Sequence, residues 1–391
     1  MATDCIPARA NGAMWKEMPT AMKRIIYDLT YEMLEEELTS WGEPRYRARQ
    51  VWEWLYKKYA TDFSQMSNLP RALRERLDAT FTLTPLTPVV EEVSRDRWTR
   101  KSLLALPDGQ TVELVLMLYE KRRTLCISSQ VGCGMGCPFC ATGLSGFSRN
   151  LSPGEIVAQV LHYARWLADP TAGGEDAAPV PRPTRVTNVV FMGMGEPMAN
   201  YDRVWQAIRI LVDKRGFNLG ARHITVSTVG IVPGILRMAE EPLQVTLAIS
   251  LHAPEDELRN HLVPINRTYP IPLLMDAVRT YIRRTKRRVT FEYALMRGIN
   301  DRPEHARALA RLLKGMLVHV NLIPINPVEG SPYQPTPRKD TVRFARTLEA
   351  AGIPVTVRLR RGIDINAGCG QLRRRTLANK KPHTSFQVAV S

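Results

Sequence analysis

Four of the six cysteines in this chain lie within fifteen residues, and their spacing is the strongest chemical signal in the sequence. Cys133, Cys137 and Cys140 form the pattern C-x3-C-x2-C inside the glycine-rich stretch VGCGMGCPFCATG. A glycine-rich backbone can wrap closely around a bulky inorganic group, and cysteine thiolates are the ligands of iron-sulfur clusters. Three thiolates leave one iron of a four-iron cluster open, so the spacing predicts a cluster that binds a further ligand.

A structural zinc site is the alternative interpretation of the same cysteines. Such sites have four ligands, often arranged as two close pairs. The sequence lacks a second close pair, and Cys126 is a candidate for the fourth thiolate. With zinc the chain would be a non-catalytic, zinc-stapled RNA-binding protein, whereas the tight loop of three cysteines favours the cluster.

The charge balance predicts a polyanionic partner. The 391 residues include 54 Lys and Arg against 38 Asp and Glu, a net charge of +16, and a surplus of this size attracts nucleic acid. The basic residues occur in blocks at 283–288, 358–362 and 373–375, which favours contacts with phosphates. Since the sequence has neither an apolar run of membrane-spanning length nor an apolar leader, we expect a cytoplasmic protein with no membrane partner.

The pattern of apolar residues divides the chain into five parts. These are a flexible tail over 1–24, a helical accessory domain over 25–90, a β-rich connection over 91–125, an α/β domain over 126–375 and a second tail over 376–391. Strands and helices alternate after residue 126, which predicts about six βα units and a partial (β/α)6 barrel. The Pro- and Gly-containing segment 169–187 is expected to be a flexible surface insertion.

Ligands of barrels collect at the carboxyl ends of the strands, and several candidate residues lie at or just after the ends of predicted strands here. They are Gly195, Glu196, Ser227, Ser250, Leu251, His252 and Asn326. Glycine-rich turns between a strand and a helix are common structural features, and a single histidine is more often a hydrogen-bonded core residue than a ligand. These positions are therefore candidates that need a further reason.

Three more residues carry chemical groups without a motif of their own. Cys126 ends a predicted strand seven residues before the first cysteine of the cluster motif, and Cys369 lies between glycines in AGCGQL. Free cysteines often pack as small hydrophobic residues. Glu113, in the strand-like run VELVLM, has the simple interpretation of a carboxylate that faces water from an alternating strand.

The order of several motifs adds the missing reason. The run TLCISSQVGCGMGCPFCATGLSGFSRNLSPGEI is followed by MGMGEPMAN, HITVSTVG, SLHAP, LIPINP and DINAGCGQL. In this order they resemble the radical S-adenosylmethionine (SAM) enzymes of the RlmN family, which are dual-specificity rRNA and tRNA adenine C2-methyltransferases. The resemblance extends from about residue 25 to 375, and RARQVWEWLY is similar to the accessory RNA-binding domain of that family.

The resemblance implies a set of cofactors and partners. It implies a [4Fe-4S] cluster on Cys133, Cys137 and Cys140, two molecules of SAM per turnover, and SAM contacts at the strand-end candidates. The implied substrates are an adenosine near the peptidyl-transferase centre of 23S rRNA and the adenosine 3′ of the anticodon in tRNA. A low-potential electron donor such as flavodoxin or ferredoxin and a monomeric state are also expected.

The resemblance also assigns roles to the three isolated residues. Cys369 would accept a methyl group and become an S-methylcysteine, Glu113 would be the proton acceptor, and Cys126 would form a transient disulfide with Cys369. Such covalent carriage divides one difficult transfer into two steps. The sister group Cfr, which methylates C8 of the same rRNA adenine, is the alternative within this chemistry.

Overall fold

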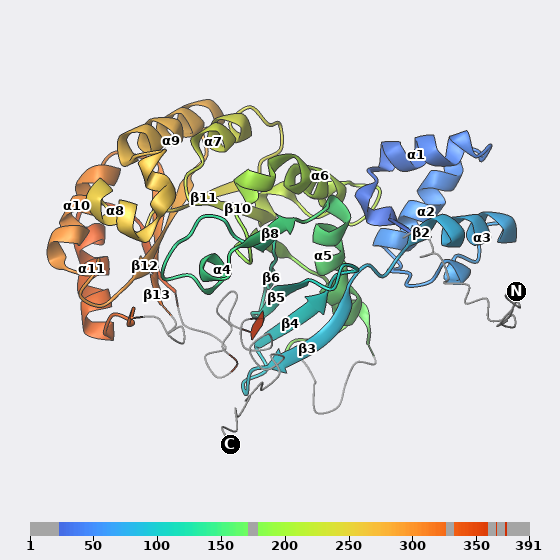
Figure 1. The fold of residues 1–391 in the computed structure, drawn as a ribbon, viewed down its shortest axis with the longest axis horizontal. Helices are drawn as coiled ribbons and strands as arrows, with labels where there is room; N and C mark the ends of the chain where they lie inside the picture. Colours follow the sequence, from blue (N-terminus) through green and yellow to red (C-terminus); the bar gives the residue numbers. More distant parts are fainter. Residues whose placement is uncertain (1–22, 171–178, 326–331, 359–364, 366–371, 374–391) are drawn as a thin grey trace, which may run out of the picture.

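The computed structural model describes residues 23–170, 179–325, 332–358, 365 and 372–373. Two of the candidate site residues, Asn326 and Cys369, lie outside the described residues, as do most of the two expected tails and part of the segment 169–187. In the described part, a small group of helices lies at one end of a long, strongly curved sheet (Figure 1).

The first part of the described chain is helical. It contains η1 (Ile26–Asp28), α1 (Tyr31–Ser40), α2 (Tyr46–Tyr56), η2 (Phe63–Gln65) and α3 (Arg71–Thr80), and the short strands β1 (Arg24–Ile25) and β2 (Phe81–Thr82) pair in parallel at its ends. Trp52 is fully buried in its core, whereas Trp54 is partly exposed with the Lys58 ammonium over its ring. One of these two tryptophans is therefore a core residue and the other belongs to a basic, aromatic surface.

The sheet has ten strands in the order β14-β13-β12-β11-β10-β9-β6-β5-β4-β3. Their bounds are β3 (Thr87–Val93), β4 (Thr99–Ala105), β5 (Thr111–Leu118), β6 (Arg123–Cys126), β9 (Asn188–Phe191), β10 (Ile224–Thr228), β11 (Thr246–Ser250), β12 (Val289–Leu295), β13 (Val318–Pro324) and β14 (Val355–Val357). The strands β3 to β6 pair antiparallel, and β6 and β9 to β14 pair in parallel. The residues PDG at 107–109 lie in the turn of the antiparallel β4–β5 hairpin.

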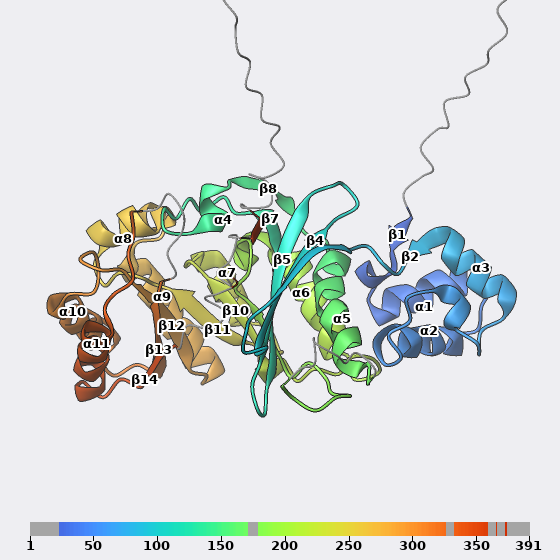
Figure 2. The same cartoon turned by 90° about the horizontal axis from the view of Figure 1, so that it is seen from below.

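Helices join the parallel strands and cover the outer side of the curved sheet (Figures 1 and 2). They are α5 (Pro153–Ala168), α6 (Tyr201–Val212), α7 (Val232–Met238), α8 (Asp256–Leu262), α9 (Ile271–Thr285), α10 (Pro303–Leu313) and α11 (Arg338–Ala350), with the short η3 (Pro197–Asn200), η4 (Ala221–His223) and η5 (Pro264–Arg267) between them. Each βα unit leads to the next parallel strand, so the expected partial (β/α)6 barrel is confirmed.

The apolar sequence pattern explains this arrangement. Strands buried on both faces must be apolar almost throughout, and β11 (TLAIS) and β12 (VTFEYAL) meet that need with few polar residues. Helix α5 begins with a capping box in which Ser152 and Glu155 bond to each other's backbone amides. Helix α9 ends at Lys286 in the left-handed conformation with φ of 55°.

The cysteine loop lies on the inner side of the sheet. The strands β7 (Gln130–Gly132) and β8 (Phe147–Asn150) pair antiparallel and enclose the loop, which includes α4 (Ala141–Leu144). Gly132 has φ of 77°, and a Cβ atom there would lie 1.9 Å from the carbonyl oxygen of Gly146. Glycine is therefore required where the two ends of the loop meet.

None of the helices within the described residues is long and apolar enough to cross a membrane.

Candidate active site

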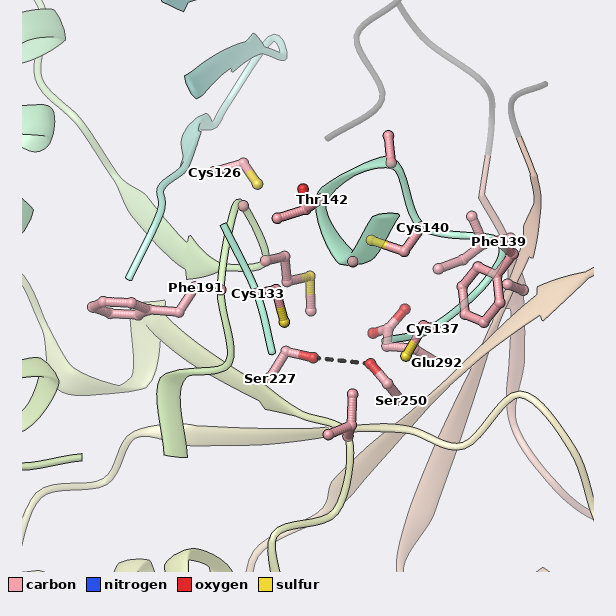
Figure 3. Close-up of a pocket in the computed structure, with 18 of the residues that line it drawn as sticks. Cys126, Cys133, Cys137, Phe139, Cys140, Thr142, Phe191, Ser227, Ser250 and Glu292 are labelled. Atoms are coloured by element: carbon pink, nitrogen blue, oxygen red, sulfur yellow. Dashed lines mark hydrogen bonds between the residues drawn. The ribbon is translucent and has the colours of Figure 1, made fainter. Parts of the chain in front are cut away.

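A cavity of about 390 Å³ opens on the inner side of the sheet, at the carboxyl ends of the parallel strands. Its lining brings together residues from β5, β6, the cysteine loop and the ends of β9 to β13 (Figure 3). Nine of the residues singled out from the sequence line it. They are Cys126, Cys133, Cys137, Cys140, Gly195, Glu196, Ser227, Ser250 and His252.

The thiols of Cys133, Cys137 and Cys140 all line this cavity (Figure 3). Burial raises the pKa of the Cys133 thiol to about 11 and raises that of Cys137 further, and the neighbouring Cys140 also raises both. Thiols that resist ionisation by themselves become thiolates when a metal centre compensates their charge. Among the described residues, no three His, Cys, Asp or Glu side chains are grouped as ligands of a single metal ion.

Glu196 joins the end of β9 to the end of β10. Its Oε1 accepts the amide N–H of Met198 at 3.0 Å and its Oε2 accepts that of Val229 at 2.9 Å. Burial raises the pKa of this carboxyl group to about 7. Gly195 before it has φ of 101°, and a Cβ there would come within 2.5 Å of the Gln130 side chain, so this turn requires glycine.

The serines at the ends of β10 and β11 form a hydroxyl pair. The Oγ atoms of Ser227 and Ser250 are 3.4 Å apart and face the cavity (Figure 3). The buried Arg259 fixes the backbone that follows these two strands. Its guanidinium donates to the carbonyl oxygens of Leu251 at 3.1 Å and Val229 at 2.6 Å. Burial lowers the pKa of Arg259 to about 10.

His252 has a left-handed backbone, with φ of 60°. Its Nδ1 accepts the amide N–H of Ala294 at 3.0 Å, and the Phe139 ring meets the imidazole edge-on at 5.1 Å. Burial lowers the pKa of His252 to about 3. This histidine is therefore neutral and part of the wall that faces the cysteine loop.

Cys126 and Glu113 lie beside the cavity on neighbouring strands. Cys126 pairs with Val115 across β6 and β5, and its buried thiol lines the cavity. Glu113 is only 3% exposed, so its interpretation as a water-facing carboxylate is wrong. Its Oε2 lies 3.0 Å from the buried Lys101 ammonium, and its Oε1 accepts the amide N–H of Arg373 at 2.5 Å.

Leu251 is the one described strand-end candidate whose side chain lies outside the cavity lining. It is fully buried in the main hydrophobic core, and its amide N–H donates to the carbonyl oxygen of Glu292 at 3.1 Å. In a parallel strand end, consecutive side chains point to opposite faces, so Leu251 faces the core between two residues that face the cavity.

Several lining residues were missed from the sequence. Phe139, Thr142, Met192, Glu292 and Arg358 line the cavity with the predicted residues. Glu292 is the one with a readable signal, since a carboxylate inside the otherwise apolar strand VTFEYAL is unusual. Phe139 and Thr142 lie in the cysteine loop beside Cys140, whereas Met192 and Arg358 follow β9 and β14 and reach this cavity only through the strand order.

Comparison with known proteins agrees with this geometry. A model of the radical SAM superfamily matches residues 127–312, and a model of the ribosomal RNA large subunit methyltransferase N-terminal domain matches residues 26–83. The crystal structure of a radical SAM methyltransferase from Sphaerobacter thermophilus has a TM-score of 0.84 and 51% identity, covering 89% of this chain and 98% of that one. The fold and the cysteine loop thus define a radical SAM enzyme.

Curated relatives give the family. The probable dual-specificity RNA methyltransferase RlmN of Chloroflexus aurantiacus is 52% identical over 356 residues, which is 90% of this chain and 93% of the relative. The protein of the same description from Roseiflexus castenholzii is 50% identical over 379 residues, 89% of this chain and 95% of the relative. This chain therefore belongs to the RlmN family of radical SAM methyltransferases.

The residues present fit the cofactors of this superfamily. Three thiols on one loop face a cavity that also contains the Ser227–Ser250 hydroxyl pair and the Glu196 turn. The cavity of about 390 Å³ is in the range of sites that bury a small ligand. An iron-sulfur cluster on the thiols and SAM along the strand ends would occupy complementary parts of it.

Proposed function

We propose that this protein is a radical SAM RNA methyltransferase that transfers a methyl group to C2 of an adenosine in 23S rRNA and in tRNA. The observation that carries the proposal is the shared cavity. It contains three cluster-type thiols, the hydroxyl pair of Ser227 and Ser250, and the separate thiol of Cys126. An ordinary displacement cannot methylate an electron-poor aromatic carbon, so cluster and thiol chemistry in one cavity suit this reaction.

The cofactor roles follow from the lining. Cys133, Cys137 and Cys140 would hold a [4Fe-4S] cluster, and bound SAM would supply both the methyl group and the radical for its transfer. The SAM-binding set would be Gly195, Glu196, Ser227, Ser250, Leu251, His252 and Asn326, with Asn326 outside the described residues and Leu251 restricted to its backbone. Two SAM molecules would be consumed per turnover.

Cys369 is the proposed methyl carrier. Its thiolate would attack the methyl carbon of a first SAM, displace S-adenosylhomocysteine and form an S-methylcysteine. Cys369 lies outside the described residues, but it precedes Arg373 by only four positions, and the Arg373 amide contacts Glu113 on β5.

Glu113 and Cys126 would complete the transfer. Once the carbon is attached to the adenine, Glu113 would accept the C2 proton. The Cys126 thiolate would then attack the Cys369 sulfur and form a disulfide, while the carbon released from that sulfur would take up a proton and become the methyl group on adenine. The unpaired electron left by the radical addition would return to the electron carrier, and a two-electron reduction of the disulfide would restore both thiols. Cys126 pairs with Val115, two residues from Glu113 on the same face of β5, which supports their acting on one substrate.

Partners follow from charge and family. A net charge of +16 suits an RNA substrate, and the helical segment 25–90 would be an accessory RNA-binding domain. The target adenosine must leave its stack to reach the cavity, at a cost of a few kcal/mol. A monomer that receives electrons from flavodoxin or ferredoxin in the cytoplasm completes the proposal.

The first prediction concerns the product. The protein, reconstituted without oxygen and supplied with SAM, a reductant and 23S rRNA or tRNA, is expected to produce 2-methyladenosine, identified by mass spectrometry of the digested RNA. 8-Methyladenosine would instead place it with the Cfr activity, and a colourless protein that retains zinc would support the non-catalytic alternative. As a matched control, Cys369→Ala is expected to keep the iron and the visible absorbance of the cluster but to lose methylation.

A further inference from the structure

Glu292 is a buried carboxylate that the proposed reaction does not use. It lies in the middle of β12, is 4% exposed, and lines the cavity beside Ser250 and the cysteine loop (Figure 3). One strand away, Asn321 donates from Nδ2 to Glu292 Oε1 at 2.9 Å. The Glu292 carboxylate is therefore held by β13, whereas Ser250 lies on the opposite neighbouring strand, β11.

The second carboxylate oxygen has no such partner. Among the described residues nothing donates a hydrogen bond to Glu292 Oε2, and almost none of this atom is exposed to water. Burial raises the pKa of the group, with Arg358 and Asn321 opposing the shift. Leaving a buried acceptor unsatisfied costs about 1 to 3 kcal/mol, so such an atom in a cavity wall indicates a donor on the ligand.

The strand register places this oxygen in a row of hydrogen-bonding groups. Ser250, Glu292 and Asn321 are directly paired across β11, β12 and β13, and paired residues of neighbouring strands are about 4.8 Å apart on the same face. Ser227 is paired with Ala248 in the register, but its hydroxyl reaches to 3.4 Å from that of Ser250. The ligand therefore meets a carboxylate and a hydroxyl side by side.

The chemistry of the row selects one part of SAM. Two adjacent acceptors match the two vicinal hydroxyls of a ribose, and carboxylates bind ribose hydroxyls in this way in dinucleotide sites. The SAM carboxylate would be repelled by Glu292. The Glu196 turn, at the end of β9 on the other side of the cavity, remains for the methionyl end.

We propose that Glu292 is a further SAM-binding residue, whose Oε2 accepts a hydrogen bond from a ribose hydroxyl of the nucleoside. The inference rests on the proposed function, because it takes SAM as the ligand. It assigns to Glu292 the recognition of the sugar and leaves the reacting atoms to other residues. Asn321 acts as a positioning residue through its bond to Oε1.

The test compares SAM with its 2′-deoxy and 3′-deoxy analogues. Their affinities are measured by equilibrium dialysis on the holoprotein with its cluster oxidised, so that SAM is not cleaved. Wild type is expected to bind at least one deoxy analogue about tenfold or more weakly than SAM, as expected for a hydrogen bond to a charged group. Glu292→Gln and Glu292→Leu are expected to bind SAM about as weakly as wild type binds that analogue. Each variant should bind SAM and the deoxy analogue with equal affinity.

The controls separate this inference from a folding defect. Glu241→Gln removes a carboxylate that is bonded to Tyr201 and Arg209 outside the cavity, and it should behave as wild type. Iron content and visible absorbance report whether each variant keeps its cluster. Wild-type protein that binds both deoxy analogues as tightly as SAM overturns the inference without any variant.

Two further outcomes have distinct meanings. Glu292 variants that keep the cluster and still discriminate against the deoxy analogue as wild type does would also overturn the inference. In both cases SAM binding by wild type, and with it the proposed function, would stand. A wild-type holoprotein that binds no SAM would overturn the proposed function and this inference together.

Discussion

Buried polar side chains around the cavity act mainly on the backbone. Glu196 accepts two amide N–H groups, Arg259 donates to the carbonyl oxygens that follow β10 and β11, and His252 accepts the amide of Ala294. Strand ends leave backbone groups unpaired, and unpaired buried groups are costly. The side chains therefore fix the strand-end loops in place before any ligand binds.

His252 provides a pH prediction at this scale. Its pKa is lowered to about 3 by burial, whereas an unfolded histidine titrates near 6.5. Between these values the unfolded chain binds a proton that the folded chain does not, so the free energy of unfolding should fall as the pH falls below about 6.5. The contribution of His252 at pH 5 is expected to be a loss of about 2 kcal/mol.

Urea unfolding of the holoprotein at pH 7 and pH 5 checks this prediction. His252→Asn, which tolerates the left-handed backbone, should lose less stability on acidification than wild type. The exposed His223 offers a matched control, His223→Asn, with the wild-type pH dependence. An equal loss in His252→Asn and wild type would contradict the neutral, buried state of His252.

At the scale of elements, an ion-pair network ties the cysteine loop to the barrel. Arg149, at the end of the loop in β8, donates to both oxygens of Glu155 at 2.8 Å and to Asp108 in the β4–β5 turn at 2.6 Å. Glu155 also belongs to the capping box of α5. The network therefore joins the loop, the hairpin and the first barrel helix.

Breaking this network should loosen the loop. Arg149→Met leaves the Glu155 carboxylate, only 6% exposed, without its cation, and we expect a loss of about 2 kcal/mol in the free energy of unfolding, as for hydrogen bonds to a charged group. Thermal unfolding and the rate of iron release from the holoprotein measure the effect. Arg71→Met removes an exposed cation from the Arg71–Glu75 pair on α3 and should change neither the thermal unfolding nor the rate of iron release. An equal effect of the two variants would show that the Arg149 network does not stabilise the cysteine loop.

At the scale of the whole molecule, the position of charge matters more than its amount. The basic block 283–288 ends α9 and precedes β12, so it lies at the amino ends of the parallel strands, opposite the cavity. Within it, Arg287 donates to the carbonyl oxygens of Gln244 and Val245, and Arg284 pairs with Glu240. Part of this block is thus structural.

RNA that presents an adenosine to the cavity should not need this block. We expect Arg283→Gln combined with Arg288→Gln to keep the wild-type RNA affinity and its salt dependence, measured as the slope of log Kd against log salt. Loss of two phosphate contacts would instead reduce that slope by about 1.8. A reduction of this size would show that the RNA also contacts Arg283 and Arg288, at the end of the barrel opposite the cavity.

The helical part is joined to the barrel by specific contacts. Asp28 accepts the amide N–H of Gly154 at 2.7 Å, and Arg165 of α5 donates to the Tyr27 hydroxyl at 2.8 Å and to the carbonyl oxygen of Tyr59 at 3.2 Å. Both views show α1 to α3 beside α5 and α6 (Figures 1 and 2). These contacts keep its partly aromatic, basic surface at a set position relative to the cavity.

The sequence by itself determined the features that depend on neighbours along the chain. The spacing of Cys133, Cys137 and Cys140, the alternation of strands and helices and the strand-end residues Ser227 and Ser250 could all be read directly. Local spacing and apolar periodicity are encoded within a few residues. The barrel, the cysteine loop and several residues of the cavity lining were therefore predictable.

Only the tertiary structure decided which distant residues meet. It placed Cys126 in the wall of the cavity, buried Glu113 between Lys101 and the Arg373 amide, turned Leu251 into the core and brought Glu292 into line with Ser250. These outcomes depend on strand order and register, which arise from packing across the whole sheet. A single strand such as VTFEYAL does not carry that information, because the face of a side chain acquires meaning only when its neighbours are in place.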